Sequence, residues 1–187
     1  MATTNSLVTA VNQTYFNNFM AEDGTTHRIR DGQTFLGTAF GNLAVPAGAT
    51  IDGILIEMEG QALAADHDAQ VGDWISVSND GGTTFSTAQS VTTGTWSVGI
   101  GTGTLNLEQA GGSTELWGMS WDADSANDIQ VRMTWSSSGG DAVYLDYIKV
   151  YIYYTVGQTT YTSDDQVILS GGTLELKSGM TIIGSKK

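Results

Sequence analysis

The stretch IDGILIEMEG, residues 51–60, decides the fold class because apolar and polar side chains alternate along it. In an extended chain, successive side chains point to opposite faces, so every second residue shares a face. One face carries Ile54, Ile56 and Met58, and the other carries Leu55, Glu57 and Glu59. We expect the first face to be buried beneath a second layer. We expect the second face to be solvated or to lie in a contact between subunits.

Other parts of the chain repeat this alternation. Residues 129–136, IQVRMTWS, alternate strictly, which predicts a half-buried antiparallel strand. Residues 142–155, AVYLDYIKVYIYYT, predict a long strand that turns Ile148, Val150 and Ile152 toward the core. The motif NDGG at 79–82 is typical of a tight hairpin turn. Shorter strands are predicted over residues 34–45, 73–78, 83–86, 95–98 and 104–107, with loops over residues 60–72 and 110–114.

The predicted elements define an all-β chain. The sequence has 24 glycines and one proline, many of the glycines separate short apolar runs, and no stretch predicts a convincing helix. Short alternating strands joined by such turns are typical of an antiparallel β-sandwich. We expect the sandwich over residues 33–156, an extended N-terminal arm over residues 1–32, and a C-terminal β-arm or hairpin over residues 157–187. Apolar residues of the two end segments are candidates for contacts with partner chains: Phe16, Phe19, Leu174 and Leu176.

Charge and composition exclude several classes of function. Seven basic residues against 20 acidic ones give a net charge of -13, which disfavours direct binding to nucleic acid or to an anionic membrane. Cysteine is absent, so disulfides are excluded. No apolar run approaches the roughly 18 residues of a membrane span, and the first residues do not resemble a signal peptide. We therefore expect a protein made in the host cytoplasm without a signal peptide.

Four motifs in order carry a resemblance to a known group of domains. They are VPAGATIDGILIEMEG at 45–60, VSNDGGTTFS at 77–86, STELWGMSWDADSANDIQVRMTW at 113–135 and AVYLDYIKVYIYYT at 142–155. Together they resemble the jelly-roll-like β-sandwich domains of tailed-phage and prophage virion proteins. The matching positions are Pro46, Gly48, Ala49, Ile51, Gly53, Ile54, Asp80 to Gly82, Leu116 to Gly118, Trp121 and Asp146 to Tyr154. The resemblance covers roughly residues 35–156 and implies a jelly-roll-like sandwich.

The resemblance also implies a role. We expect a structural protein on the capsid surface of a virion, most simply a decoration (cement) protein that bridges neighbouring subunits through its arms. Its partners would be the major capsid protein and copies of itself, as a homotrimer. The alternative is a tail-fibre or receptor-binding module that recognises a host glycan.

No motif predicts an enzyme. The sequence lacks G-x-S-x-G, a P-loop and H-E-x-x-H, so we expect no catalytic residues and no cofactor. The aspartates of WDADSANDI, namely Asp122, Asp124 and Asp128, are weak candidates for calcium ligands. The alternative is an Asx-rich turn before the next strand, without a metal.

Aromatic residues supply the remaining candidates. Tyr147, Tyr151 and Tyr153 share one face of the last long strand. Such a face either binds a sugar or a protein, or is covered by a neighbouring strand, loop or arm. Trp96, flanked by threonine and serine near a glycine-rich loop, is the tryptophan that we expect to be exposed.

Overall fold

The computed structural model describes residues 1–11, 22, 24–30, 32–41, 43–62, 75–91, 105–134 and 142–157. The chain divides into two compact units, Met1–Val156 and Gly157–Lys187. Of the second unit only Gly157 is described, so the predicted C-terminal β-arm or hairpin lies outside the described residues. The candidates Phe16, Phe19, Trp96, Leu174 and Leu176 also lie outside them, as does the strand predicted over 95–98.

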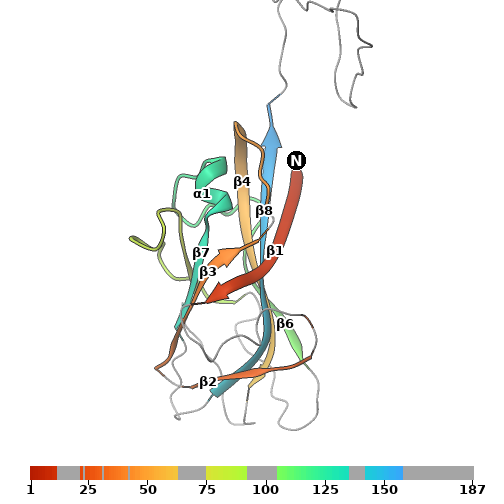
Figure 1. Ribbon diagram of the computed structural model, residues 1–187, viewed down its shortest axis with the longest axis vertical. Helices are drawn as coiled ribbons and strands as arrows, with labels where there is room; N and C mark the ends of the chain where they lie inside the picture. The colour runs from red at the N-terminus through yellow and green to blue at the C-terminus, as the bar shows by residue number, and fades with distance from the viewer. Residues whose placement is uncertain are drawn as a thin grey trace, which may run out of the picture. The chain divides into compact units, whose positions relative to one another are not determined.

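The described residues of the first unit form strands and one short helix (Figure 1). The elements are β1 Ala2–Val11, β2 His27–Arg30, β3 Thr34–Phe40, β4 Ala49–Ala62, β5 Ile75–Ser78, β6 Asn106–Gly112, α1 Ala123–Asn127, β7 Gln130–Thr134 and β8 Ala142–Val156. All strand pairs are antiparallel. In the first sheet β8 pairs with β4 on one edge and with β1 and β2 on the other, and β6 lies beyond β4. The second sheet has the order β5, β7, β3, β1.

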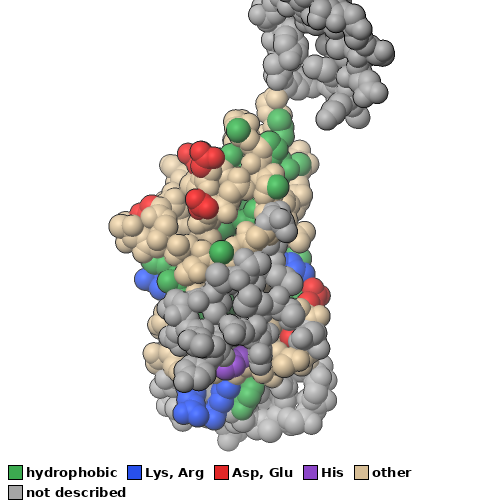
Figure 2. Space-filling view, viewed as in Figure 1, with side chains coloured by type: hydrophobic (Ala, Val, Ile, Leu, Met, Phe, Trp, Pro, Cys, Tyr) green, Lys and Arg blue, Asp and Glu red, His purple; other side chains and the backbone are tan. Residues whose placement is uncertain are grey.

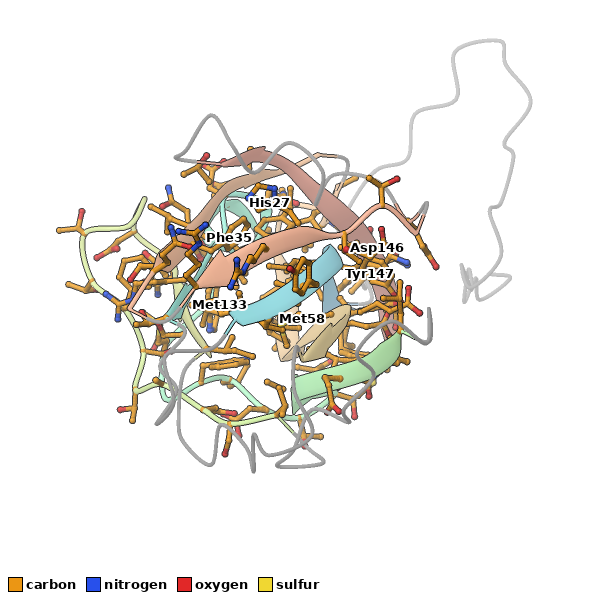
Figure 3. All side chains as sticks on the ribbon, turned by 90° about the horizontal axis from the view of Figure 1, so that it is seen from below. His27, Phe35, Met58, Met133, Asp146 and Tyr147 are labelled. Carbon is orange, nitrogen blue, oxygen red and sulfur yellow. The ribbon has the colours of Figure 1, made fainter. Side chains whose placement is uncertain are left out.

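The two sheets pack face to face, which confirms the all-β antiparallel sandwich. Ile54, Ile56 and Met58 are buried, as the alternation of residues 51–60 predicts. Figure 3 shows Met58 of the first sheet in the interior with Phe35 and Met133 of the second. The core-facing side chains predicted for the last strand, Ile148, Val150 and Ile152, are fully buried.

Strand β1 belongs to both sheets. Its residues Ala2 to Leu7 pair with β8, and Val8 to Val11 pair with β3. This corrects the expected N-terminal arm over residues 1–32, because β1 and β2 are strands of the sandwich. The residues at the start of β1 are mostly polar and exposed, so they do not alternate as a half-buried strand does.

Several element boundaries also differ from the prediction. Strand β6 runs through residues 110–112, where a loop was expected, because Gly111 adopts a positive φ of 82° without leaving the ladder with β4. Residues 83–86 form no strand with β5, although the Ser86 N–H donates to the Val77 carbonyl. The Asx-rich segment forms the helix α1, because Asp122 caps the N–H of Ser125.

Two β-bulges interrupt the pairing of β4 with β8. Ile51 pairs with Tyr154 and Gly53 with Tyr153, so Asp52 is the extra residue of the first bulge. Glu59 pairs with Tyr147 and Gly60 with Leu145, so Asp146 is the extra residue of the second. A bulge changes which face the following side chains occupy.

Candidate functional site

The second bulge places a group of polar side chains on the outer face of the first sheet. Before the bulge, Val143 and Leu145 face the core, and after it Ile148 does. Two successive residues, Asp146 and Tyr147, therefore lie on the same outer side (Figure 3). We name this group the outer-face cluster, and it consists of Glu22, Glu57, Glu59, Gln109, Asp146, Tyr147, Lys149 and Tyr151.

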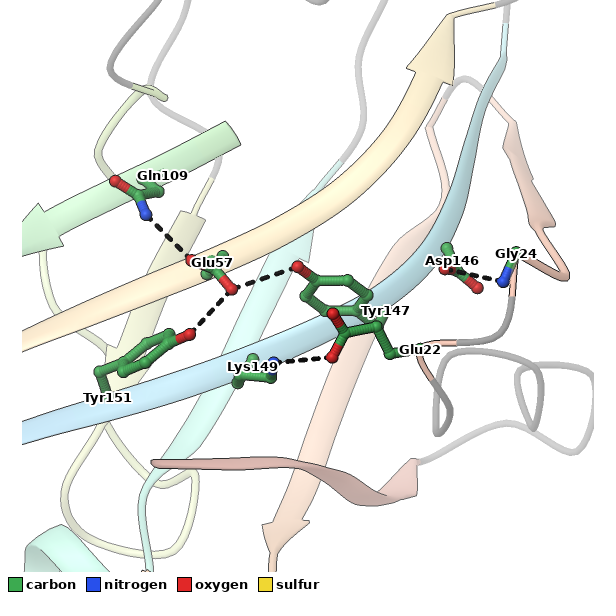
Figure 4. Close-up of polar contacts among 8 residues, drawn as sticks. All are labelled: Glu22, Gly24, Glu57, Gln109, Asp146, Tyr147, Lys149 and Tyr151. Carbon is green, nitrogen blue, oxygen red and sulfur yellow. Dashed lines mark hydrogen bonds and ion pairs between the residues drawn. The ribbon is translucent and has the colours of Figure 1, made fainter. Parts of the chain in front are cut away.

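Glu57 is the centre of this cluster (Figure 4). Its Oε1 accepts hydrogen bonds from the Tyr147 hydroxyl at 3.2 Å and from the Tyr151 hydroxyl at 3.0 Å. Its Oε2 accepts from Nε2 of Gln109 at 3.0 Å. Glu57 is only 8% exposed. Its carboxylate is therefore buried within the chain, whereas we expected its face to be solvated or to lie in a contact between subunits. Its side-chain hydrogen bonds connect three adjacent strands, β4, β6 and β8, in addition to their backbone pairing.

A second set of contacts holds the chain before β2 against this face. Lys149 forms an ion pair with Glu22 at 2.9 Å, and its ammonium lies 4.9 Å from the centre of the Tyr147 ring. The Gly24 N–H donates to Oδ2 of Asp146 at 3.1 Å. Tyr147 is buried at 3% exposure, whereas Tyr151 and Tyr153 are half-buried. The alternative of a covered face therefore holds for Tyr147.

The carboxylates of the cluster shift the titration of their neighbours. Burial, followed by the charge of Glu57, raises the pKa of Tyr147 above its usual range. Burial and the hydrogen bond to Glu57 raise the pKa of Tyr151 to about 12. Burial and the charge of Asp146 raise the pKa of Glu59. The outer-face cluster therefore favours the protonated form of each of these three groups.

We expect the tyrosines of the cluster to couple ionisation to alkaline unfolding. A tyrosine with a raised folded pKa adds stability below its unfolded value of 10.0, and that contribution is lost as pH rises through the folded value. Tyrosinate absorbance during an alkaline titration should show Tyr147 and Tyr151 ionising last, together with loss of the β-sheet circular dichroism. In Tyr147→Phe/Tyr151→Phe, the late-ionising fraction should be absent. Late ionisation that persists in this double variant would contradict the assignment.

An acidic pocket lies at the junction of the 79–81 turn and α1. It has a volume of about 530 Å³, and its lining includes Asp80, Asp122, Asp124, Asp128 and Gln130. Hydrogen bonds from the Thr84 backbone and hydroxyl lower the pKa of Asp80 to about 2. The Ser125 backbone N–H and hydroxyl likewise lower the pKa of Asp122. Both carboxylates thus stay ionised over most of the pH range.

The pocket does not arrange its aspartates as calcium ligands. Asp122 Oδ1 is occupied by the Ser125 N–H at 2.8 Å and the Ser125 hydroxyl at 2.7 Å, as part of a capping box. Among the described residues, no group of three or more Asp, Glu, His or Cys side chains is placed to hold a metal ion. The structure therefore brings Asp122, Asp124 and Asp128 to one pocket, and the geometry fits the alternative of a local capping segment.

The basic side chains of the first unit have distinct surroundings. Arg28 and Arg30 are exposed on β2, on either side of the buried Ile29. Arg132 lies on the ring of Phe85 at 4.0 Å and donates to the Ser76 hydroxyl at 3.1 Å. On the face shown in Figure 2, the histidine and a group of basic side chains lie toward the lower end, and acidic side chains lie toward the upper end and beside a basic side chain on the right.

Sequence patterns missed the two most buried carboxylates of the outer-face cluster, Glu57 and Asp146. One available signal was the shift in phase along residues 142–155. There the apolar core positions change from odd numbers, Val143 and Leu145, to even numbers, Ile148 and Val150. Such a shift within one strand predicts a bulge, and hence an extra side chain on the outer face.

Comparisons with known proteins identify no relative of this chain. No family model matches it, and neither a curated protein nor a solved structure does so. In the part of the chain that the structure describes, no helix has the length and apolar character needed to cross a bilayer.

Proposed function

We propose that this chain is a structural protein of a tailed-phage particle, a capsid decoration protein that binds the outer shell and links neighbouring copies of itself. The observation that carries the proposal is the division of the chain directly after β8. This strand ends at Val156, which is 53% exposed, and the chain continues into the separate unit Gly157–Lys187. The sequence predicts a β-arm or hairpin for residues 157–187, and such a segment is suited to strand addition on a neighbouring chain.

Two features of the sandwich support the same role. The four motifs that resemble virion domains all fall in the first unit, and the chain forms an antiparallel sandwich as those domains do. The outer-face cluster joins three strands by side-chain hydrogen bonds, which restrains the first sheet of the sandwich. Binding to a rigid surface loses less conformational entropy than binding to a mobile one.

The test compares the mass in solution of the full chain with that of a variant ending at Val156. We expect light scattering to give three times the 19.8 kDa mass of one chain for the full protein, and a monomer for the shortened variant. The shortened variant keeps every described strand, so circular dichroism should show the same sandwich in both. A monomer in both cases would contradict subunit linkage through residues 157–187.

A receptor-binding module that recognises a glycan is the second candidate. It is favoured by the half-buried Tyr151 and Tyr153, whose rings lie on the outer side of β8. Glu57 itself has three donors, so it is poorly available to a sugar hydroxyl. Binding on a glycan array that is lost in Tyr151→Ala/Tyr153→Ala, from a monomeric protein, would favour this candidate over the first.

A further inference from the structure

One oxygen of the buried carboxyl group of Asp146 has no hydrogen-bond partner among the described residues. Asp146 is 1% exposed, and its Oδ2 accepts the Gly24 N–H. Its Oδ1 is the buried side-chain oxygen without a partner. A buried carboxylate oxygen without a donor is strongly unfavourable, so this atom points to a proton or a cation nearby.

The second carboxyl group at this position belongs to Glu59. The bulge sets Asp146 opposite the step from Glu59 to Gly60, and the charge of Asp146 adds to burial in raising the pKa of Glu59. Two ionised carboxylates offer only acceptors, so a hydrogen bond between them requires a proton on one of them. Oδ1 of Asp146 lacks a donor among the described residues, and a proton on Glu59 would supply one.

We propose that Glu59 and Asp146 share one proton, and that loss of this proton loosens the contacts that hold Glu22 and Gly24 on the outer face of the first sheet. The inference is independent of the proposed function, because it concerns only the outer-face cluster. It gives the cluster a conformational response to pH. The part of the chain that would respond is the segment that contains Glu22 and Gly24.

The charges around the pair explain why one proton has this effect. The charged and titratable groups around the pair are Tyr147 and Lys149 of β8, Glu57 of β4, and Glu22 from the segment before β2. His27 of β2 pairs with Leu145, next to Asp146, and burial lowers the pKa of His27. Lys149 is the one cation in this set at neutral pH, and it already binds Glu22. A second negative charge beside Asp146 would therefore repel Glu22 without a new cation to offset it.

A divalent cation between the two carboxylates is the competing explanation for the Oδ1 atom. Calcium requires six to eight oxygen ligands, several of them from carboxylates. The described residues supply no group of three ligating side chains. A shared proton needs only the two carboxyl groups that are present, so the geometry favours the proton.

The sign of the pH effect follows from the raised pKa of Glu59. A carboxyl group with a raised folded pKa adds stability that is fully present below its unfolded value of 4.5. This contribution is lost as pH rises through the folded value. The pH range over which this stability is lost therefore begins near pH 4.5 and extends upward.

The experiment measures the thermal midpoint of the full chain from acidic to mildly alkaline pH, for the wild type and for Glu59→Gln. The glutamine amide can donate to Asp146 at every pH, so the variant should match the wild type in acid. We expect the variant to exceed it by about 3 °C once Glu59 has ionised. At the same alkaline pH, the Gly24 amide should exchange with solvent more slowly in the variant. Both proteins contain His27, so its titration cancels when the curve of thermal midpoint against pH for the wild type is subtracted from that for the variant.

Two further variants keep the test decisive. Asp52→Asn alters the aspartate of the other bulge, which accepts from the Thr155 hydroxyl, and its profile should run parallel to that of the wild type. Asp146→Asn can accept from Gly24 and donate to ionised Glu59, so it should lose the same pH dependence even if Glu59→Gln fails to fold. If the thermal midpoints of the wild type and Glu59→Gln differ by the same amount at every pH, the proposal is overturned. Calcium chloride that raises the wild-type midpoint but not that of Glu59→Gln would also overturn it.

Discussion

Alanine at position 111 is expected to lower the free energy of unfolding by about 4 kcal/mol. Gly111 has a positive φ of 82°, which an L side chain rarely adopts. An added Cβ would lie 2.3 Å from the Ile54 carbonyl oxygen and 2.9 Å from the indole of Trp117. That indole donates from Nε1 to the same oxygen at 3.1 Å, so the added methyl group would force apart β4, β6 and the buried tryptophan.

Gly48→Ala is the matched control for this prediction. Gly48 has a φ of 76°, close to that of Gly111, but no heavy atom lies within 4 Å of the position of its added Cβ. The free energy of unfolding of Gly48→Ala should therefore fall by only about 1 kcal/mol, the cost of a positive φ for alanine. Urea unfolding of both variants, followed by tryptophan fluorescence, measures the difference. Equal losses would show that crowding against Ile54 and Trp117 contributes nothing.

Glu57→Ala should lower the free energy of unfolding by about 3 kcal/mol, the second large effect. The substitution removes the acceptor for two tyrosine hydroxyls and for Gln109. The Tyr147 hydroxyl is the most costly to leave unpaired, because its residue is 3% exposed. Urea unfolding again gives the measurement.

Glu57→Gln serves as the control for the hydrogen bonds. Its amide oxygen can still accept from both tyrosines at nearly the same volume, so we expect a loss of about 1 kcal/mol. Glutamine also removes a negative charge beside the two hydroxyls, so the pKa values of Tyr147 and Tyr151 should fall toward 10.0. If alanine and glutamine cost the same, the outer-face cluster derives its stability from charge and not from these hydrogen bonds.

Period-two alternation was sufficient to predict much of the sandwich. Residues 51–59, 129–134 and 142–155 all have one face buried by the second sheet, and a buried face imposes alternation on the sequence. Strand β1 could not be found this way. Its polar start lies exposed beside β8, where backbone hydrogen bonds rather than apolar burial hold the strand.

The candidate site was harder to predict than the fold. The stripe of Tyr147, Tyr151 and Tyr153 was correctly placed on one face of the last strand, yet the residue that organises it, Glu57, was assigned to a solvated or intersubunit face. A polar residue opposite a core face is solvated in most sheets. Here tyrosine and glutamine side chains from the neighbouring strands bind Glu57. The sequence of β4 alone does not predict these contacts.

The position of β8 in the first sheet has a consequence for how the chain folds during synthesis. Strands β1, β2 and β4 all pair with β8, which is the last strand of the first unit to leave the ribosome. Ala2 pairs with Tyr154, a contact that spans nearly the whole unit in sequence. Contacts of such high sequence separation form slowly, because the entropy of closing the loop must be overcome first. The first sheet can therefore assemble only after translation has passed residue 156, and until then β4 exposes a strongly apolar strand to other nascent chains.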